Sequence, residues 1–172
     1  SGKVYITPSP HGAHSWHAMS YNPGTGYVYI PTIHDASYYD ARNINADDWK
    51  NNPKKGGIGV SLSDPDSAHL PRPYSGSLQA WDPVNQKQIW SVPYPELWNG
   101  GTLTTAGNLV FQGAANGILY AYHALNGKKL WQYDAGLGIS APPITYKING
   151  KQYIAILVGW GGAFAGVGNK NL

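Results

Sequence analysis

Two fifteen-residue segments of this chain share one pattern. Residues 76–90 read GSLQAWDPVNQKQIW, and residues 117–131 read GILYAYHALNGKKLW. In each segment an alternating strand meets a polar turn, and a second strand follows that ends in tryptophan. Each segment therefore predicts a β-hairpin. A chain that carries the same hairpin twice is built from repeated units, and this constrains its fold more than any other feature.

Segments of a second kind stand before and after these hairpins and also read as strand, turn, strand. They are residues 17–31, 102–113 and 143–159, with turns predicted at Asn22-Pro23, Ala106-Gly107 and Asn149-Gly150. The order is an inner hairpin and an outer hairpin, twice over, followed by a last inner hairpin whose outer partner is not present. Four-stranded units that recur every ~40 to 50 residues are typical of a β-propeller, in which each unit is one blade. We therefore predict an all-β fold of about two and a half four-stranded antiparallel blades.

Composition agrees with many short strands joined by tight turns. The 172 residues include 22 glycines, 13 prolines, 13 tyrosines and 7 tryptophans. This length suits one domain, so residues 1–172 are interpreted as one partial propeller domain. Residues 32–74 interrupt the repeat with a polar segment rich in proline and glycine, which predicts a long excursion on one rim. Tyr38, Tyr39 and Trp49 in it either form a cover or pack within a surface loop.

Charge and composition also exclude some classes of protein. The net charge is +3, only 12% of residues are charged, and the lysines are scattered, so the basic stripe of a nucleic-acid-binding protein is missing. No run of 18 apolar residues predicts a membrane span, and the start SGKVYITPSP does not resemble a signal peptide. Because cysteine is absent, this segment has no disulfide, no thiolate metal site and no covalent haem attachment.

The repeated hairpins also carry a known motif. The spacing Ala-x-Asp-x-x-x-Gly-x-x-x-Trp is the tryptophan-docking motif of quinoprotein dehydrogenase propellers, and residues 80–90 and 121–131 resemble two copies. Gln86 replaces the glycine of the first copy, and His123 replaces the aspartate of the second. We expect Trp90 and Trp131 to pack between blades, and each turn to lose one stabilising feature.

Three longer phrases make the resemblance more specific. They are GAHSWHAMSYNPGTGYVYIP, LWNGGTLTTAGNLVFQGAANG and GISAPPITYKINGKQYIAILVGWGG. They closely resemble the C-terminal part of the propeller in alcohol dehydrogenases that use pyrroloquinoline quinone (PQQ), especially the soluble quinohaemoprotein type. In that family eight blades surround a funnel that holds the quinone and a calcium ion, and an aspartate accepts the alcohol proton while a hydride passes to the quinone.

The resemblance also implies the kind of enzyme to which this chain belongs. It implies a fragment of a periplasmic enzyme that oxidises a small primary alcohol to an aldehyde, with the remaining blades in the same or a partner chain and a cytochrome c as candidate electron acceptor. The calcium ligands and the catalytic aspartate lie upstream in the family and have no recognisable counterpart here. A haem c requires a further domain, since this segment lacks CxxCH.

The starts of the three innermost strands supply the candidate site residues. A flat polar cofactor needs an indole face, amide or hydroxyl donors, and small residues at close approaches. The resemblance implies Ser15 and Trp16 as edge contacts, Trp98 and Asn99 as a wall and hydrogen-bond donor, and Ala141 as a small lining residue. Some family members have asparagine in place of Ser15, so a weaker or shorter hydrogen bond is implied there. Alternatively, the two tryptophans pack between blades and Asn99 forms only a turn.

Other functions stay open as alternatives. One alternative is that the chain is part of a quinoprotein-like propeller without cofactor, which acts as a scaffold or protein-binding module. Another is a β domain that binds glycans through exposed aromatic residues. His11, His14 and His17 have the spacing of metal ligands on a helix, but Pro8 and Gly12 argue against a helix there. The carboxylates of residues 32–74 show no spacing typical of glycoside hydrolysis.

Overall fold

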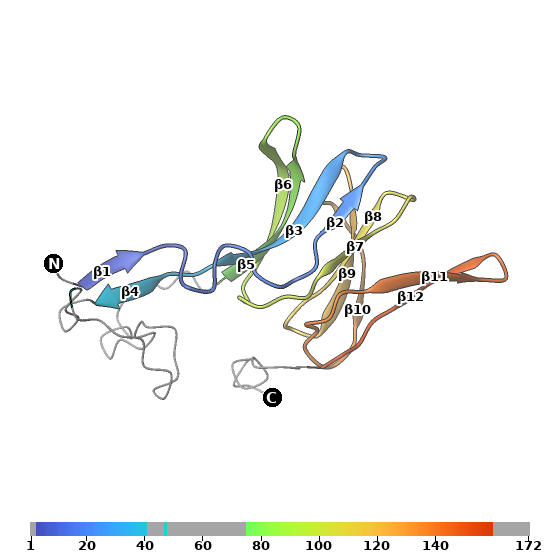
Figure 1. The fold of residues 1–172 in the computed structure, drawn as a ribbon. Helices are drawn as coiled ribbons and strands as arrows, with labels where there is room; N and C mark the ends of the chain where they lie inside the picture. The colour runs from blue at the N-terminus through green and yellow to red at the C-terminus, as the bar shows by residue number, and fades with distance from the viewer. Residues whose placement is uncertain (1–2, 41–46, 48–74, 160–172) are drawn as a thin grey trace.

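The computed structural model of the protein describes residues 3–40, 47 and 75–159. All regular structure in these residues is β (Figure 1). The strands are β1 (Lys3–Ile6), β2 (Ser20–Asn22), β3 (Tyr27–His34), β4 (Ser37–Asp40), β5 (Ser75–Asp82), β6 (Lys87–Tyr94), β7 (Thr102–Thr104), β8 (Leu109–Gly113), β9 (Ile118–His123), β10 (Lys129–Asp134), β11 (Ile144–Ile148) and β12 (Lys151–Ala155). Within the described part of the chain, no helix is long and apolar enough to span a membrane.

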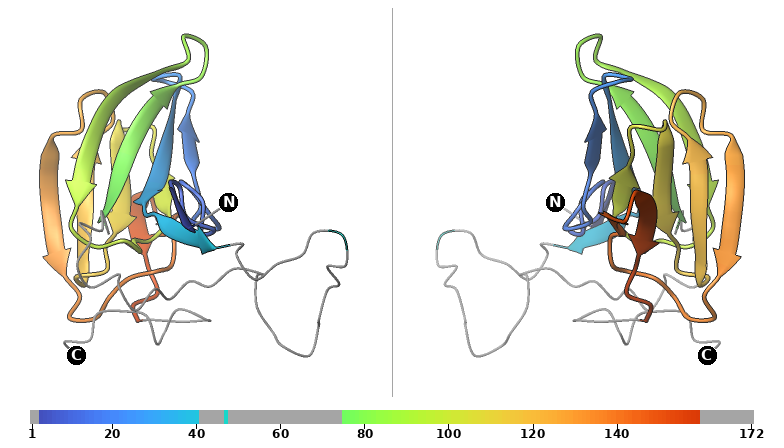
Figure 2. Two further views of the ribbon diagram at one scale, coloured as in Figure 1. Left: turned by 90° about the vertical axis from the view of Figure 1, so that its left-hand side faces the viewer. Right: turned by 90° about the vertical axis from the view of Figure 1, so that its right-hand side faces the viewer.

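The described strands form two four-stranded antiparallel sheets and two two-stranded ones, β1-β4 and the hairpin β11-β12. The first sheet has the order β2-β3-β5-β6, the second has the order β7-β8-β9-β10, and β11 pairs with β12. The predicted succession of inner and outer hairpins is thereby confirmed. The last hairpin turns at Asn149 and Gly150, with φ of 49° and 80°, which is the left-handed geometry that an Asn-Gly pair favours. Figures 1 and 2 show the two sheets side by side, with β11 and β12 beyond the second.

The main core lies between the two sheets, which we call blade 1 (β2, β3, β5, β6) and blade 2 (β7 to β10). Trp90 on β6 is only 8% exposed, and its Nε1 donates to the carbonyl oxygen of Ala124 in blade 2 at 2.9 Å. The hydroxyl of Tyr29 donates to the same oxygen at 3.1 Å. Gly127 lies directly against the indole, because a Cβ there would come within 2.8 Å of its ring. The predicted packing of Trp90 between blades is confirmed.

The equivalent residue of the second copy, Trp131, behaves differently. Its side chain is 50% exposed and stacks on Tyr133, with ring centroids 6.2 Å apart and planes 8° apart. Both lie on β10, the outermost strand of blade 2, all of whose residues are exposed. The expectation that Trp131 packs between blades is wrong for this structure, because no described strand covers the outer side of β10.

The two outer turns keep the same conformation by different means. Gln86 adopts a φ of 53°, close to the 70° of Gly127 at the equivalent position, although only glycine takes this conformation without steric cost. Asp82 supports the first turn, since its Oδ1 accepts from the backbone nitrogens of Val84 and Asn85, both at 3.0 Å. His123 gives weaker support to the second turn, because its Nδ1 accepts one longer bond of 3.3 Å from Leu125.

The excursion predicted for residues 32–74 begins later than expected. Strand β3 continues to His34, because its last residues pair with the start of β5, as in His34 with Ser75. Strand β4 then pairs with β1, a pairing that the sequence analysis missed, and the two project away from the blades (Figure 1). Residues 41–46 and 48–74 of the predicted excursion, including Trp49, lie outside the described residues.

Candidate functional site

The three predicted starts of the inner strands converge on one point. A Cβ at Gly101, just before β7, would lie 2.9 Å from the backbone nitrogen of Ala18 and 2.8 Å from Cβ of Pro142. The nitrogen of Thr102 donates to the carbonyl oxygen of Ala18 at 2.8 Å and so ties blade 2 to the segment before β2. Ala18, Gly101 and Pro142 precede the inner strands of successive blades. A residue with a side chain does not fit at position 101, so glycine permits this close approach.

Gly100 brings Ala141 to the same place. A Cβ at Gly100 would lie 2.9 Å from the carbonyl oxygen of Ala141 and 3.1 Å from that of Ile139. Gln112 fixes the glycine in turn, because its Nε2 donates to the Gly100 carbonyl oxygen at 2.8 Å. The structure therefore places the predicted lining residue Ala141 beside the loop that carries Asn99.

Four aromatic side chains form a continuous row next to this point, which we call the aromatic column. The Trp16 and His17 rings stack at 4.1 Å between centroids with planes 23° apart, and His17 stacks on Trp98 at 5.6 Å and 28°. His11 meets the edge of Trp98 at 5.2 Å. Trp16 is 52% exposed, whereas Trp98 is buried at 7%. Two of the predicted site residues, Trp16 and Trp98, are thus brought together, and Trp16 keeps much of its indole open.

Two members of the column, His11 and His17, were not assigned to the site from the sequence, and His17 is the more deeply buried of the two. Its side chain is buried, and neither ring nitrogen has a hydrogen-bond partner among the described residues. Burial, and secondarily the charge of His14, lower the pKa of His17 to about 4, so that its imidazole is neutral at pH 7. The sequence held one signal for it, since His17 stands between Trp16 and the start of an inner strand.

Asn99 makes two structural hydrogen bonds. Its side chain is 5% exposed, Nδ2 donates to the Glu96 carbonyl oxygen at 2.9 Å, and Oδ1 accepts from the Ala115 nitrogen at 3.1 Å. These bonds hold the loop before β7 as a turn and leave one Nδ2 hydrogen for another acceptor. Ser15 lies exposed beside Trp16. The roles of Asn99 and Ser15 toward a cofactor stay predictions.

The three N-terminal histidines diverge to different partners. His11 Nδ1 lies 2.9 Å from Oδ2 of the buried Asp35 and 3.2 Å from Oγ of Ser9. Because one nitrogen serves both contacts, this group is not the relay of a Ser-His-Asp triad, which uses two ring nitrogens. His14 Nδ1 donates to the Pro31 carbonyl oxygen at 2.6 Å. No three histidine or carboxylate side chains in the described ranges gather as metal ligands.

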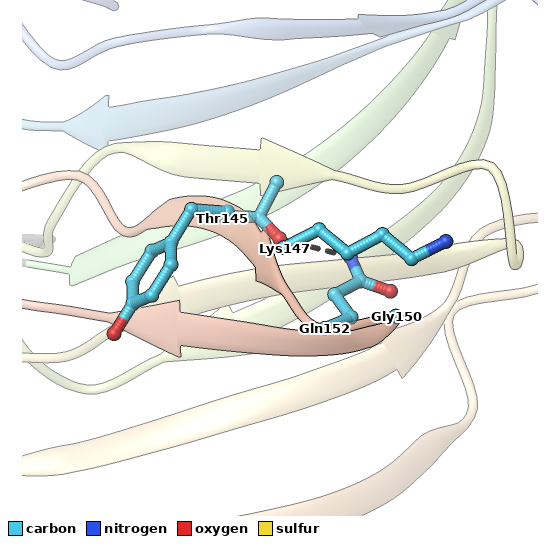
Figure 3. A pocket seen from close by; sticks show the side chains of 5 residues that line it. Thr145, Lys147, Gly150 and Gln152 are labelled. Carbon is cyan, nitrogen blue, oxygen red and sulfur yellow. Dashed lines mark hydrogen bonds between the residues drawn. The ribbon is translucent and has the colours of Figure 1, made fainter.

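A shallow hollow of about 380 Å³ lies on the last hairpin, away from the strand starts (Figure 3). Gln152 Nε2 donates to Thr145 Oγ1 across it at 2.9 Å, and Lys147 extends beside them. Tyr146 and Gly150 complete its lining. Among its lining residues Lys147 is the one charged side chain.

These features define the class of protein. Four-stranded antiparallel blades stand side by side, their inner strand starts converge, and a tryptophan of one blade docks on the next, which is the architecture of a β-propeller. The family model described as "PQQ: Glucose/ethanol/alcohol dehydrogenase, beta-propeller domain" matches residues 1–154. The chain therefore belongs to this family of PQQ β-propeller dehydrogenases.

Individual relatives agree in sequence and in structure. The chain is 46% identical over 170 residues to quinohemoprotein alcohol dehydrogenase ADH IIB of Pseudomonas putida, covering 98% of this chain and 24% of that protein. The solved structure of quinohemoprotein alcohol dehydrogenase ADHIIG from Pseudomonas putida HK5 matches with a TM-score of 0.83 and 46% identity over 94% of this chain and 24% of that one. The corresponding enzyme of Comamonas testosteroni matches with a TM-score of 0.78 and 42% identity over 95% of this chain and 25% of that one. The chain thus spans about a quarter of the length of these relatives.

Proposed function

We propose that this chain forms one wall of the quinone site in a PQQ-dependent alcohol dehydrogenase. The observation that carries the proposal is the aromatic column, in which Trp16 and Trp98 from neighbouring blades are joined through His17 where the inner strands begin. In a propeller these starts face the central channel, where a ligand is held. Membership of the PQQ family supports a quinone as that ligand.

The residues at this point fit a flat and polar ring system. Trp16 is half exposed and offers an indole for stacking, which suits an aromatic cofactor. Gly100 and Gly101 keep the backbone free of side chains, and Ala141 beside them adds only a methyl group. Ser15 contributes a hydroxyl at the exposed edge. When bound, the quinone would supply the acceptor for the two electrons of alcohol oxidation.

The remaining parts of the reaction are assigned outside this segment. In our proposal the substrate is a small primary alcohol and the product an aldehyde, while a catalytic aspartate and calcium ligands come from other blades of the same or a partner chain. The enzyme is periplasmic and passes electrons to a cytochrome c, and a haem c of its own belongs to a further domain if one is present. The names of the relatives, which are quinohemoprotein alcohol dehydrogenases, support an alcohol substrate and a haem.

Quinone binding by the complete protein tests the proposal. Apoprotein is titrated with PQQ, and binding is followed by absorbance and by the change in thermal unfolding. Trp16→Ala is expected to weaken PQQ binding about tenfold or more, as loss of stacking area predicts. Trp81→Ala is the matched control, because Trp81 lies at the end of β5 near the outer turn and is expected to retain wild-type affinity.

Two results would overturn the proposal. A complete wild-type protein that does not bind PQQ would favour the scaffold function instead. Unchanged PQQ binding in a folded Trp16→Ala variant would show that the aromatic column is not part of the quinone site.

A further inference from the structure

The side chains of two consecutive residues, Trp16 and His17, stack on each other. In an extended strand, consecutive side chains point to opposite faces. Residues 16 and 17 instead lie in a bend before β2, and their rings stack at 4.1 Å. The bend therefore places an imidazole directly beneath the exposed indole of Trp16.

The second contact of His17 anchors it to the neighbouring blade. Its ring stacks on Trp98 at 5.6 Å, and Trp98 is itself buried and meets His11 edge-on. Trp98 stands before β7, whose residue Thr102 is hydrogen-bonded to Ala18, the residue after His17. Stacking on Trp98 of blade 2 therefore fixes the His17 ring, and the hydrogen bond between Thr102 and Ala18 fixes the backbone beside it.

We infer that His17 is a positioning residue. Its ring, stacked on the buried Trp98, supports the Trp16 indole from one side and so orients that indole toward the quinone. This inference rests on the proposed function. Trp16 is half exposed, and its indole stacks on the His17 ring at 4.1 Å between centroids. A stacked support restricts the rotamers of the indole before the ligand arrives, and such preorganisation increases affinity.

The chemistry of His17 makes the role testable by substitution. Neither ring nitrogen has a partner among the described residues. His17→Phe therefore keeps a flat ring and breaks no hydrogen bond of the described structure, whereas His17→Leu has a similar volume without a flat face. If stacking orients Trp16, the two variants should differ in their near-UV circular dichroism and in their affinity for PQQ.

The experiment compares these variants in the complete apoprotein. Near-UV circular dichroism without PQQ reports on the stacked indoles, and a PQQ titration gives the dissociation constant. His17→Phe is expected to keep the near-UV signal and to bind within about twofold of wild type, and His17→Leu to lose signal and bind about tenfold more weakly. His14→Leu is the control on the same segment. It loses the bond to the Pro31 carbonyl, which lowers stability, and is expected to leave the affinity of the folded protein unchanged.

The possible failures are distinguishable. If wild type does not bind PQQ, the proposed function fails, while the near-UV signal still reports on the stack. If wild type binds and His17→Leu binds equally well, or if His17→Phe is as weak as His17→Leu, His17 is no positioning residue. Weakening by His14→Leu equal to that by His17→Leu would also overturn the inference, because the effect would then follow general destabilisation.

Discussion

Replacing Trp90 by alanine removes one of the side chains that join the two complete blades. Trp90 is 8% exposed and lies against Gly127, so its truncation opens a cavity in the core between the blades. Substitutions of buried tryptophan by alanine cost about 3–5 kcal/mol. The lost Nε1 bond adds little, because the hydroxyl of Tyr29 still donates to the Ala124 carbonyl oxygen. We therefore expect a loss of about 4 kcal/mol in the free energy of unfolding.

Trp131→Ala is the matched comparison, because Trp131 holds the same position in the second copy of the repeat. It is 50% exposed, so its truncation in residues 1–172 should cost about half as much, about 2 kcal/mol. Urea unfolding followed by far-UV circular dichroism measures both variants. Equal losses, or a loss below about 1 kcal/mol for Trp90→Ala, would refute the assignment of Trp90 to the core between blades. In the complete protein the two costs should become similar, since a following blade would cover Trp131.

Two further predictions concern the outer turn and pH. Gln86→Gly should raise the free energy of unfolding by about 0.5–1 kcal/mol, because φ at this exposed position is 53°, and thermal unfolding checks it; a lower stability would contradict the strain. The free energy of unfolding should fall as the pH is lowered from 6.5 to about 4. In this range His17 is protonated in the unfolded chain but stays neutral in the folded state, where its pKa is about 4. From pH 6.5 to 5 this amounts to about 1.6 kcal/mol. Urea unfolding at both pH values should show a smaller loss in His17→Phe, and an unchanged slope would disprove the assignment to His17.

The strand order could be predicted from the sequence because it depends on local patterns. Alternation of apolar and polar residues marks the strands, and glycine, proline and asparagine mark the turns, as at Asn149 and Gly150. The repeat then orders the hairpins into blades. Each of these signals acts between residues close in the chain, and so the sequence alone carries them.

The candidate site depends on contacts that local patterns do not contain. Trp16 and Trp98 are 82 positions apart, and only the packing of blade 1 on blade 2 brings His17 between them. The same applies to the pairing of β1 with β4. Trp90 and Trp131 show the limit most clearly, because one motif gives a buried side chain in one copy and a half-exposed one in the other. A motif determines where a side chain points, whereas burial depends on which neighbouring blade is there to receive it.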